Sequence, residues 1–254
     1  MIKLFRKIRY DLVVENGTGK YLKYAIGEIL LVVIGILIAL QINNWNENRK
    51  HNQSIKISIT SLKNDLIKDT IQLNIDIQGI RLDLEMLTDF KIRLSRPTAT
   101  IDTLKHIARY EYLPLFDPSH ELNRNTIASL LSTGNMDLFD KKLKSRILSH
   151  NSAQLKLLKV MDQNVTIFLG SQYGQGIFMQ SEHPNPMIES SVIKGPLLDK
   201  YWENKDDDIF LDTMLSKISG KLLMNTILIW TKENLLEKTN SMIEYLNNWE
   251  IEND

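Results

Sequence analysis

The chain has 254 residues, of which 43% are hydrophobic and 24% are charged. Its 31 basic and 31 acidic residues cancel, which excludes the high net charge of a disordered chain and the basic excess of a nucleic-acid-binding protein. Because the sequence contains no cysteine, disulfides, thiolate metal sites and a cysteine nucleophile are excluded as well.

Residues 1–19 carry a basic amphipathic pattern. Ile2, Phe5, Ile8 and Leu12 recur at helical spacing, with lysines and arginines between them. We expect this segment to lie on the cytoplasmic face of a membrane and to contact anionic lipid there. An ordinary solvated helix is the alternative interpretation.

Residues 20–42 are predicted to form a transmembrane helix. From Ala25 to Ile42 the sequence is apolar except for Glu28 and Gln41. A helix of this length covers about 27 Å, close to the hydrocarbon thickness of a bilayer. The run is longer than the apolar part of a signal peptide and ends without a cleavage site, so we expect an uncleaved signal anchor. A buried soluble helix is the alternative.

Basic residues indicate how the span is oriented. Those near its ends are Lys3, Arg6, Lys7, Arg9, Lys20 and Lys23 before it, and Arg49, Lys50 and Lys56 after it. The excess on the N-terminal side predicts a cytoplasmic N-terminus in a bacterial inner membrane, with residues 54–254 in the periplasm. Tyr21, Tyr24 and Trp45 are predicted to lie at the membrane–water interfaces.

Four residues within the span are candidates for function or packing. Glu28 is a carboxylate inside an apolar segment, which makes it the candidate functional residue, although it could also snorkel or pair with a nearby lysine. Gly27, Gly35 and Ala39 are small residues that permit close approach of a second helix. Self-association through this segment is therefore expected as one possibility.

Three sequence blocks support a resemblance to a known family. The chain opens with MIKLFRKIR, continues with GKYLKYAIGE before the span, and leaves it with ALQINNWNE. Together these blocks resemble a bacterial family of single-pass membrane proteins of unknown function, and residues 130–151 resemble its middle region less specifically. The resemblance implies a bacterial envelope location and a helical body, and it implies no chemistry. Glu28 matches the glutamate of the family motif.

After a polar juxtamembrane linker at residues 43–53, which is also compatible with a continuous helix, residues 54–94 are predicted to form a long helix. One apolar row recurs every seven residues, at Ile59, Leu66, Leu73, Ile80, Leu87 and Leu94. A second row, at Ile55 and Leu62, shifts by one residue near Asp69 to Ile77 and Leu84. The pattern indicates a narrow, coiled-coil-like seam with a local stutter.

Further helices are predicted in the C-terminal part of the chain. The first covers residues 101–110, and the second begins after Ser119 and ends at Thr133, before Gly134. The third starts at Asp140, with an apolar face at Leu143, Ile147, Leu155, Leu158, Val165 and Phe168. Residues 183–205 are expected to be irregular. The last helix starts at Asp206, Asp207 and Asp208 and carries Leu215, Leu222, Ile229, Leu236 and Ile243 every seven residues.

These elements predict an all-α fold, with one N-terminal transmembrane helix followed by a bundle of long helices with coiled-coil-like seams. An up-down bundle is the simplest arrangement of residues 54–254, and pairing of the heptad rows between two chains is the alternative. No spacing of histidines and carboxylates in the sequence matches a metal or catalytic motif. We therefore expect no metal, cofactor or catalytic residue, and no enzyme activity.

The predicted function is that of a membrane-anchored envelope protein, whose extracytoplasmic helical domain serves protein interaction or scaffolding. Its expected partners are membrane lipid, a second copy of the chain through the transmembrane and 54–94 helices, and an unknown envelope protein, but no nucleic acid. The alternative is a periplasmic sensor bundle that signals through the membrane helix to a separate partner. An envelope enzyme is the interpretation with the least support.

Overall fold

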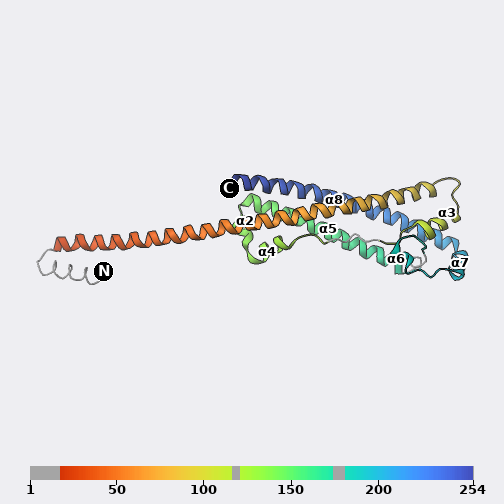
Figure 1. Cartoon of the computed structure of the whole chain (residues 1–254), viewed down its shortest axis with the longest axis horizontal. Coiled ribbons are helices and arrows are strands. Elements are labelled where there is room, and N and C mark those ends of the chain that lie inside the picture. The colour runs from red at the N-terminus through yellow and green to blue at the C-terminus, as the bar shows by residue number, and fades with distance from the viewer. Residues whose placement is uncertain (1–17, 116–120, 174–180, 254) are drawn as a thin grey trace. The chain divides into compact units, whose positions relative to one another are not determined.

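The computed structural model describes residues 18–115, 121–173 and 181–253 (Figure 1). The chain divides into two units, Met1–Ile57 and Ser58–Asp254. The described residues form helices and connecting segments with no strand among them, which confirms the all-α prediction. The basic amphipathic pattern at the N-terminus lies outside the described residues.

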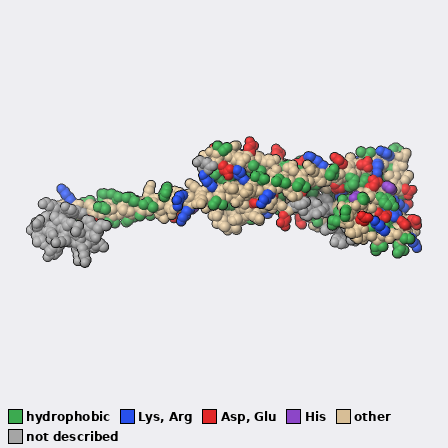
Figure 2. All heavy atoms as spheres, viewed as in Figure 1, with side chains coloured by type: hydrophobic (Ala, Val, Ile, Leu, Met, Phe, Trp, Pro, Cys, Tyr) green, Lys and Arg blue, Asp and Glu red, His purple; other side chains and the backbone are tan. Residues whose placement is uncertain are grey.

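Helix α2 runs from Thr18 to Leu94, so the predicted linker at residues 43–53 is part of a continuous helix. Between Ala25 and Leu40 its aliphatic side chains are exposed and follow one another along the helix (Figure 2). Among the described residues this is the one helix long and apolar enough to cross a membrane. Its end at Leu94, shortly before Pro97, is where the sequence predicted it.

The second unit is built on the C-terminal part of α2 together with α5 (Lys141–Tyr173) and α8 (Asp207–Asn253), which pack along one another (Figure 1). Three ion pairs join α2 to α8 in reversed order along the chain: Lys63–Glu250, Asp76–Lys232 and Asp83–Lys221. The two helices are therefore antiparallel. In the same way, α5 is antiparallel to α8, because His150 contacts Thr239 and Asn164 contacts Met224.

Since α2 and α5 consequently run in the same direction, the segment between them returns the chain, unlike in a simple up-down bundle. It contains α3 (Ile101–His106), the π-helical turn η1 (Ile107–Glu111), α4 (Asn125–Thr133) and η2 (Asn135–Leu138). The helix predicted over residues 101–110 is confirmed as α3 and η1. The left-handed Gly134, with φ of 74°, ends α4 as predicted.

Helix α4 starts later than predicted, and Ser119, the expected cap, lies outside the described residues. Carboxylates of α2 instead bind backbone N–H groups here: Asp65 accepts from Thr126 N in the first turn of α4 at 3.1 Å, and Asp69 accepts from Asn123 N just before the helix at 2.7 Å. The capping groups therefore come from a distant part of the chain, which local sequence patterns do not reveal.

The stretch at residues 183–205, predicted to be irregular, contains two short helices. They are α6 (Pro186–Glu189) and α7 (Pro196–Glu203), and each has a proline in its first turn. Proline has no N–H to satisfy there and a φ already suited to a helix, so the prolines begin helices rather than interrupt them. α7 also contributes a buried Trp202, which meets Phe210 of α8 edge to face with ring centroids 6.0 Å apart.

Helices α5 and α8 follow their capping predictions more closely than their core predictions. Asp140 and Asp206 each accept hydrogen bonds from the first turn of the following helix, as expected. Leu155 and Leu215, however, were assigned to apolar faces but are 46% and 42% exposed. The predicted face of α5 is otherwise right, since Leu143, Ile147 and Phe168 are buried. The predicted row of α8 is only half-buried or exposed, because the core side of that helix also carries polar residues such as Lys221 and Lys232.

The seam of α2 is buried within the second unit. Ile59, Leu66, Leu73 and Leu87 are at most 1% exposed. Leu87 joins a cluster with residues of α3, η1, α7 and α8, and Leu73 joins one with α5 and α8. These side chains therefore pack within their own chain, which leaves other faces of α2 for contact with a second chain.

Candidate functional site

The small and aromatic residues proposed for the membrane span all lie on α2. A Cβ added at Gly27 or Gly35 would meet no heavy atom within 4 Å, and Ala39 is exposed. The side chains of Tyr21 and Tyr24 are outside the described part of the molecule. The described small residues thus present an accessible helix surface.

Glu28 and Trp45 lie toward the two ends of the apolar segment. Glu28 is half-buried, whereas Trp45 is 66% exposed. The guanidinium carbon of Arg49 lies 5.7 Å from the Trp45 ring centroid, a cation–π geometry that combines an apolar ring with a charged group. Such a pair suits the boundary between lipid and water.

Three aspartates of α2, seven residues apart, point into the core of the second unit. Asp69 is 1% exposed, and the side chains of Asp76 and Asp83 are 6% and 20% exposed. Because seven residues make about two helical turns, the three carboxylates lie on one face of the helix. We call Asp69, Asp76 and Asp83 the aspartate ladder, and each is met by polar groups from other elements.

Asp83 binds two residues of α8. Lys221 Nζ lies 3.1 Å from Oδ1 and 3.0 Å from Oδ2 of Asp83, and it also donates to the carbonyl of Leu113 at 2.9 Å. Asn225 Nδ2 donates to Asp83 Oδ2 at 2.6 Å. Burial lowers the pKa of Lys221, and the carboxylate of Asp83 opposes that shift. The lysine is thus held by an acid and a carbonyl, without contact with bulk water.

Asp76 forms the most deeply buried ion pair of the ladder. Its Oδ2 lies 2.5 Å from Lys232 Nζ, and Gln72 Nε2 donates to its Oδ1 at 2.8 Å. Arg81 and Glu233 of the same two helices also pair, at 2.6 Å, but their side chains are 58% and 44% exposed. A buried pair contributes little net stability but is costly to break, so its main effect is to fix the alignment of α2 and α8.

Asp69 joins α2 to two further elements. Its Oδ1 accepts hydrogen bonds from the backbone N–H of Asn123, at 2.7 Å, and from the Asn123 amide, at 2.9 Å. Its Oδ2 accepts from Gln154 Nε2 of α5 at 2.8 Å. Burial raises the pKa of Asp69 in spite of these donors. The ladder thus contacts the return segment, α5 and α8.

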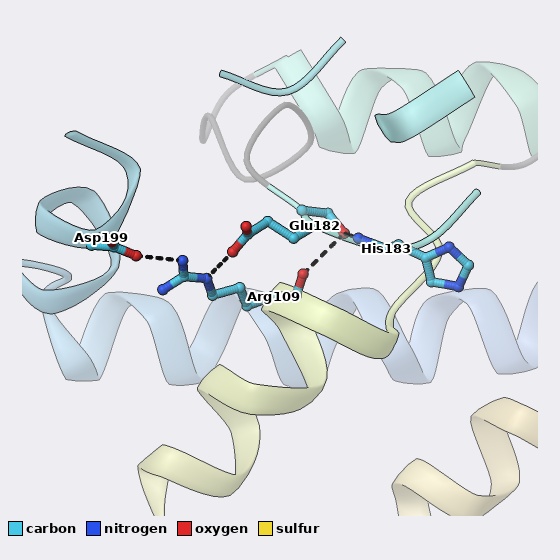
Figure 3. A network of polar contacts seen from close by, with 5 residues as sticks. Arg109, Glu182, His183 and Asp199 are labelled. Atoms are coloured by element: carbon cyan, nitrogen blue, oxygen red, sulfur yellow. Dashed lines mark hydrogen bonds and ion pairs between the residues drawn. The ribbon is translucent and has the colours of Figure 1, made fainter. Parts of the chain in front are cut away.

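A second polar network surrounds the π-helical turn η1 (Figure 3). The guanidinium of Arg109 points between Glu182 and Asp199, donating to Glu182 from Nε and to Asp199 Oδ1 from Nη2 at 2.6 Å. The backbone N–H of Glu182 donates to the Arg109 carbonyl at 2.6 Å. This Arg109 clamp fastens the segment at residues 181–183 to η1 and α7.

The clamp positions His183, whose ring points away from Arg109 (Figure 3). The backbone N–H of Asn185 donates to His183 Nδ1 at 3.0 Å. Burial lowers the pKa of His183, the charge of Lys221 lowers it further, and Asp83 opposes both. His183 is therefore neutral at pH 7, and since Nδ1 is an acceptor, its proton is on Nε2.

Two members of the aspartate ladder, Asp76 and Asp83, meet His183 at a groove of about 550 Å³ between α2 and α8. Its polar part comprises His183, Asn225 and the Asp76–Lys232 and Asp83–Lys221 pairs. Its aliphatic lining includes Ile75, Ile80, Leu82, Met86, Leu113 and Leu228. A mostly apolar groove with a few oriented polar groups is typical of a small-molecule site, and its volume falls in the usual range.

The described residues include no group of three or more His, Asp or Glu side chains that could hold a metal ion. The lysines at the groove already bind the ladder carboxylates, at 3.0 Å for Lys221 and 2.5 Å for Lys232. The arrangement can offer apolar surface and a hydrogen-bond donor to a ligand, which is binding chemistry.

The sequence contained a signal for the ladder that the predicted stutter obscured. Leu62, Asp69, Asp76, Asp83 and Phe90 recur every seven residues in unbroken phase. The helix keeps its register, and the core positions change from apolar to acidic. The Arg109 clamp had no such signal, since its residues come from three segments without a common period.

A family of unknown function, DUF6090, matches residues 28–110 of the chain. The matched region covers most of the apolar segment, the aspartate ladder and η1 up to Tyr110. No match was found among curated proteins or among solved structures.

Proposed function

We propose that this chain is a single-pass membrane protein that associates with a second copy of itself through the exposed face of α2 in the second unit. The observation that carries this proposal is an outward-facing row of aliphatic side chains: Ile67, Ile71, Ile75 and Leu82 are 44%, 58%, 57% and 67% exposed. We call these four residues the outer row.

The outer row lies on one side of the helix because its members are separated by four and seven residues. Single exposed leucines and isoleucines are common on protein surfaces, but a contiguous aliphatic row indicates a contact surface. The seam of α2 is buried within its own chain and cannot serve this purpose. The outer row is therefore the face of α2 that suits a partner helix.

Membrane anchoring supports a self-association surface. The apolar segment at Ala25–Leu40 would confine all copies to one bilayer, which raises their effective concentration and makes a modest contact sufficient. The basic residues before the span support a cytoplasmic N-terminus, with the second unit in the periplasm of a bacterial inner membrane. Gly27, Gly35 and Ala39 would then permit close helix approach within the bilayer.

The absence of cysteine from the sequence permits a direct test. In membranes, Ile71→Cys should form an oxidised dimer, whereas Gln163→Cys, at an exposed position of α5, should remain monomeric. Equal cross-linking at the two positions, or none at Ile71, would refute the proposed interface. Adducts of Ile71→Cys with a different protein would show that the outer row has another partner.

The same two variants test the compartment. In intact cells with a permeable outer membrane, a maleimide that cannot cross the inner membrane should label Gln163→Cys without cell lysis. Labelling only after lysis would place the second unit in the cytoplasm and contradict the proposed orientation.

Sensing is the second candidate function, and the groove beside the aspartate ladder is the observation that favours it. A ligand bound there would contact the pairs that align α2 with α8. Signalling would then pass along α2 to Glu28, the basic N-terminal segment and a separate cytoplasmic partner. Glu28→Gln should change that partner's output on envelope stress, and an unchanged response would count against this candidate.

A further inference from the structure

We infer that the groove between α2 and α8 binds a single acyl chain whose carboxylate or ester carbonyl accepts a hydrogen bond from His183 Nε2. The site lies in one unit of the chain. Two of its lining residues, Ile75 and Leu82, also belong to the outer row, so an acyl chain and a partner helix would compete for these two side chains.

His183 has one ring nitrogen that accepts a hydrogen bond and one that donates. Its Nδ1 receives the N–H of Asn185 at 3.0 Å, so the neutral ring has its single proton on Nε2. The ring lines the groove, and the clamp on the neighbouring Glu182 holds the segment in place. His183 thus supplies an oriented donor, which requires a ligand with an acceptor such as a carboxylate or carbonyl oxygen.

The charged groups of the groove are already paired with one another. Asp83 is paired with Lys221 and Asp76 with Lys232, at 3.0 and 2.5 Å. Each charge of these two pairs has an opposite charge in contact, and a small, highly charged ligand would have to disrupt a buried pair to bind. A ligand with a single polar head group therefore fits these paired charges better than a polyanion or a metal ion does.

The walls of the groove are long and mostly aliphatic. Ile75 and Met86 mark the limits of the lining along α2, and a helix of this length covers about 16 Å. The wall between them is aliphatic apart from the two aspartates and Gly79, and Leu113 and Leu228 line the groove from other elements. An extended hydrocarbon chain matches such a wall, whereas a sugar or nucleotide would leave its hydroxyl groups without partners.

Gly79 provides a variant that fills the groove without disturbing the fold. A Cβ at this position would meet no heavy atom within 4 Å, so Gly79→Leu should project into the groove and also favour the helix. Gly220 of α8 is equally open but does not line the groove, which makes Gly220→Leu the matched control.

The test uses the full chain in lipid nanodiscs and a photoactivatable dodecanoic acid, with labelled sites mapped by mass spectrometry. We expect labelling at residues 75–86 and 113–115, reduced at least fivefold by Gly79→Leu and unchanged by Gly220→Leu. Labelling of residues 22–42 by probe dissolved in the bilayer serves as an internal reference and should be equal in all variants.

Competition identifies the head group. Dodecanoate should displace the probe at least tenfold better than dodecylamine, whose head group is an ammonium without an acceptor at neutral pH. His183→Phe should abolish that preference. Better displacement by a lauroyl lysophospholipid than by dodecanoate would identify a lipid ester, rather than a free acid, as the source of the chain.

Three results would overturn the inference. They are labelling confined to residues 22–42, undiminished groove labelling in a folded Gly79→Leu variant, and equal displacement by dodecanoate and dodecylamine. If Gly79→Leu failed to fold, the wild-type competition and His183→Phe would decide the question. Dimer formation is measured separately at Ile71, which does not line the groove, so the failure of either proposal can be recognised on its own.

Discussion

His150 should make the second unit lose stability between pH 7 and pH 5. The residue is 4% exposed, and its Nε2 lies 2.9 Å from the hydroxyl oxygen of Thr239. That hydroxyl donates its single proton to the Leu235 carbonyl at 2.8 Å, so it can only accept from the histidine. The proton of neutral His150 is therefore on Nε2, and the buried Nδ1 has no hydrogen-bond partner.

Protonation of His150 would create a buried N–H donor and a buried charge at Nδ1. Burial, with a smaller effect of the Lys238 charge, lowers the pKa of His150 to about 4, whereas the pKa in an unfolded chain is about 6.5. Because the folded-state pKa is the lower one, the unfolded state takes up protons first as the pH falls. The resulting loss in unfolding free energy is about 0.2 kcal/mol at pH 7 and about 2 kcal/mol at pH 5.

The measurement is urea unfolding of the full chain in detergent at pH 7 and pH 5, followed by fluorescence of the buried Trp202. His150→Phe has a ring of similar size without a titrating group, and Thr239 keeps its bond to Leu235. The variant should lose about 2 kcal/mol less than the wild type between the two pH values, at an unchanged dependence on urea.

The comparison with His150→Phe removes the contributions of other groups, since Asp69 and His183 titrate in both proteins. Equal losses of stability in the wild type and the variant would show that His150 titrates as it does in the unfolded chain. In that case the orphaned Nδ1 would have to be solvated, and the assignment of its protonation state would be wrong.

Two further substitution pairs test the local arguments. Lys232→Met removes the cation from buried Asp76 and should lower the unfolding free energy by about 3–5 kcal/mol. Arg81→Met breaks an exposed pair and should lower it by at most about 1 kcal/mol. Similar losses for the two variants in urea unfolding would contradict the distinction between buried and exposed pairs. Gly134→Ala should lower the unfolding free energy by about 1–2 kcal/mol, because φ at this residue is 74°. Gly79→Ala, at an open position within a helix, should raise the unfolding free energy by about 0.4–1 kcal/mol. The midpoints of thermal unfolding should therefore shift in opposite directions.

Helix positions could be predicted from the sequence where local chemistry decides them. Asp140 and Asp206 cap their own helices, Gly134 ends α4 with a left-handed residue, and the run to Leu94 stops before a proline. The apolar segment was also evident, because the hydrophobicity of Ala25–Leu40 needs no tertiary contact to be recognised. These features depend on residues within a few positions of one another.

The start of α4 and the core face of α8 were not predictable in the same way. The start of α4 depends on Asp65 and Asp69, and the core face of α8 depends on Lys221 and Lys232, whose polarity is compensated by partners on α2. A search for apolar periodicity rejects such positions. Pairing the seven-residue acidic period of α2 with Lys221 and Lys232, which lie eleven residues apart on one face of α8, would have recovered part of the polar core.

The energetics of the ladder bear on how α2 can act. A shift of α2 by one helical turn, about 5.4 Å along its axis, would separate Asp76 from Lys232 and Asp83 from Lys221. At about 3–5 kcal/mol for each buried pair, the cost approaches the whole stability of a typical domain. Coupling between a ligand site and a distant site is usually about 1–3 kcal/mol, which is too little to drive such a shift. The ladder therefore favours a rigid second unit that presents a fixed surface, and a ligand in the groove would act by reinforcing that surface rather than by sliding α2.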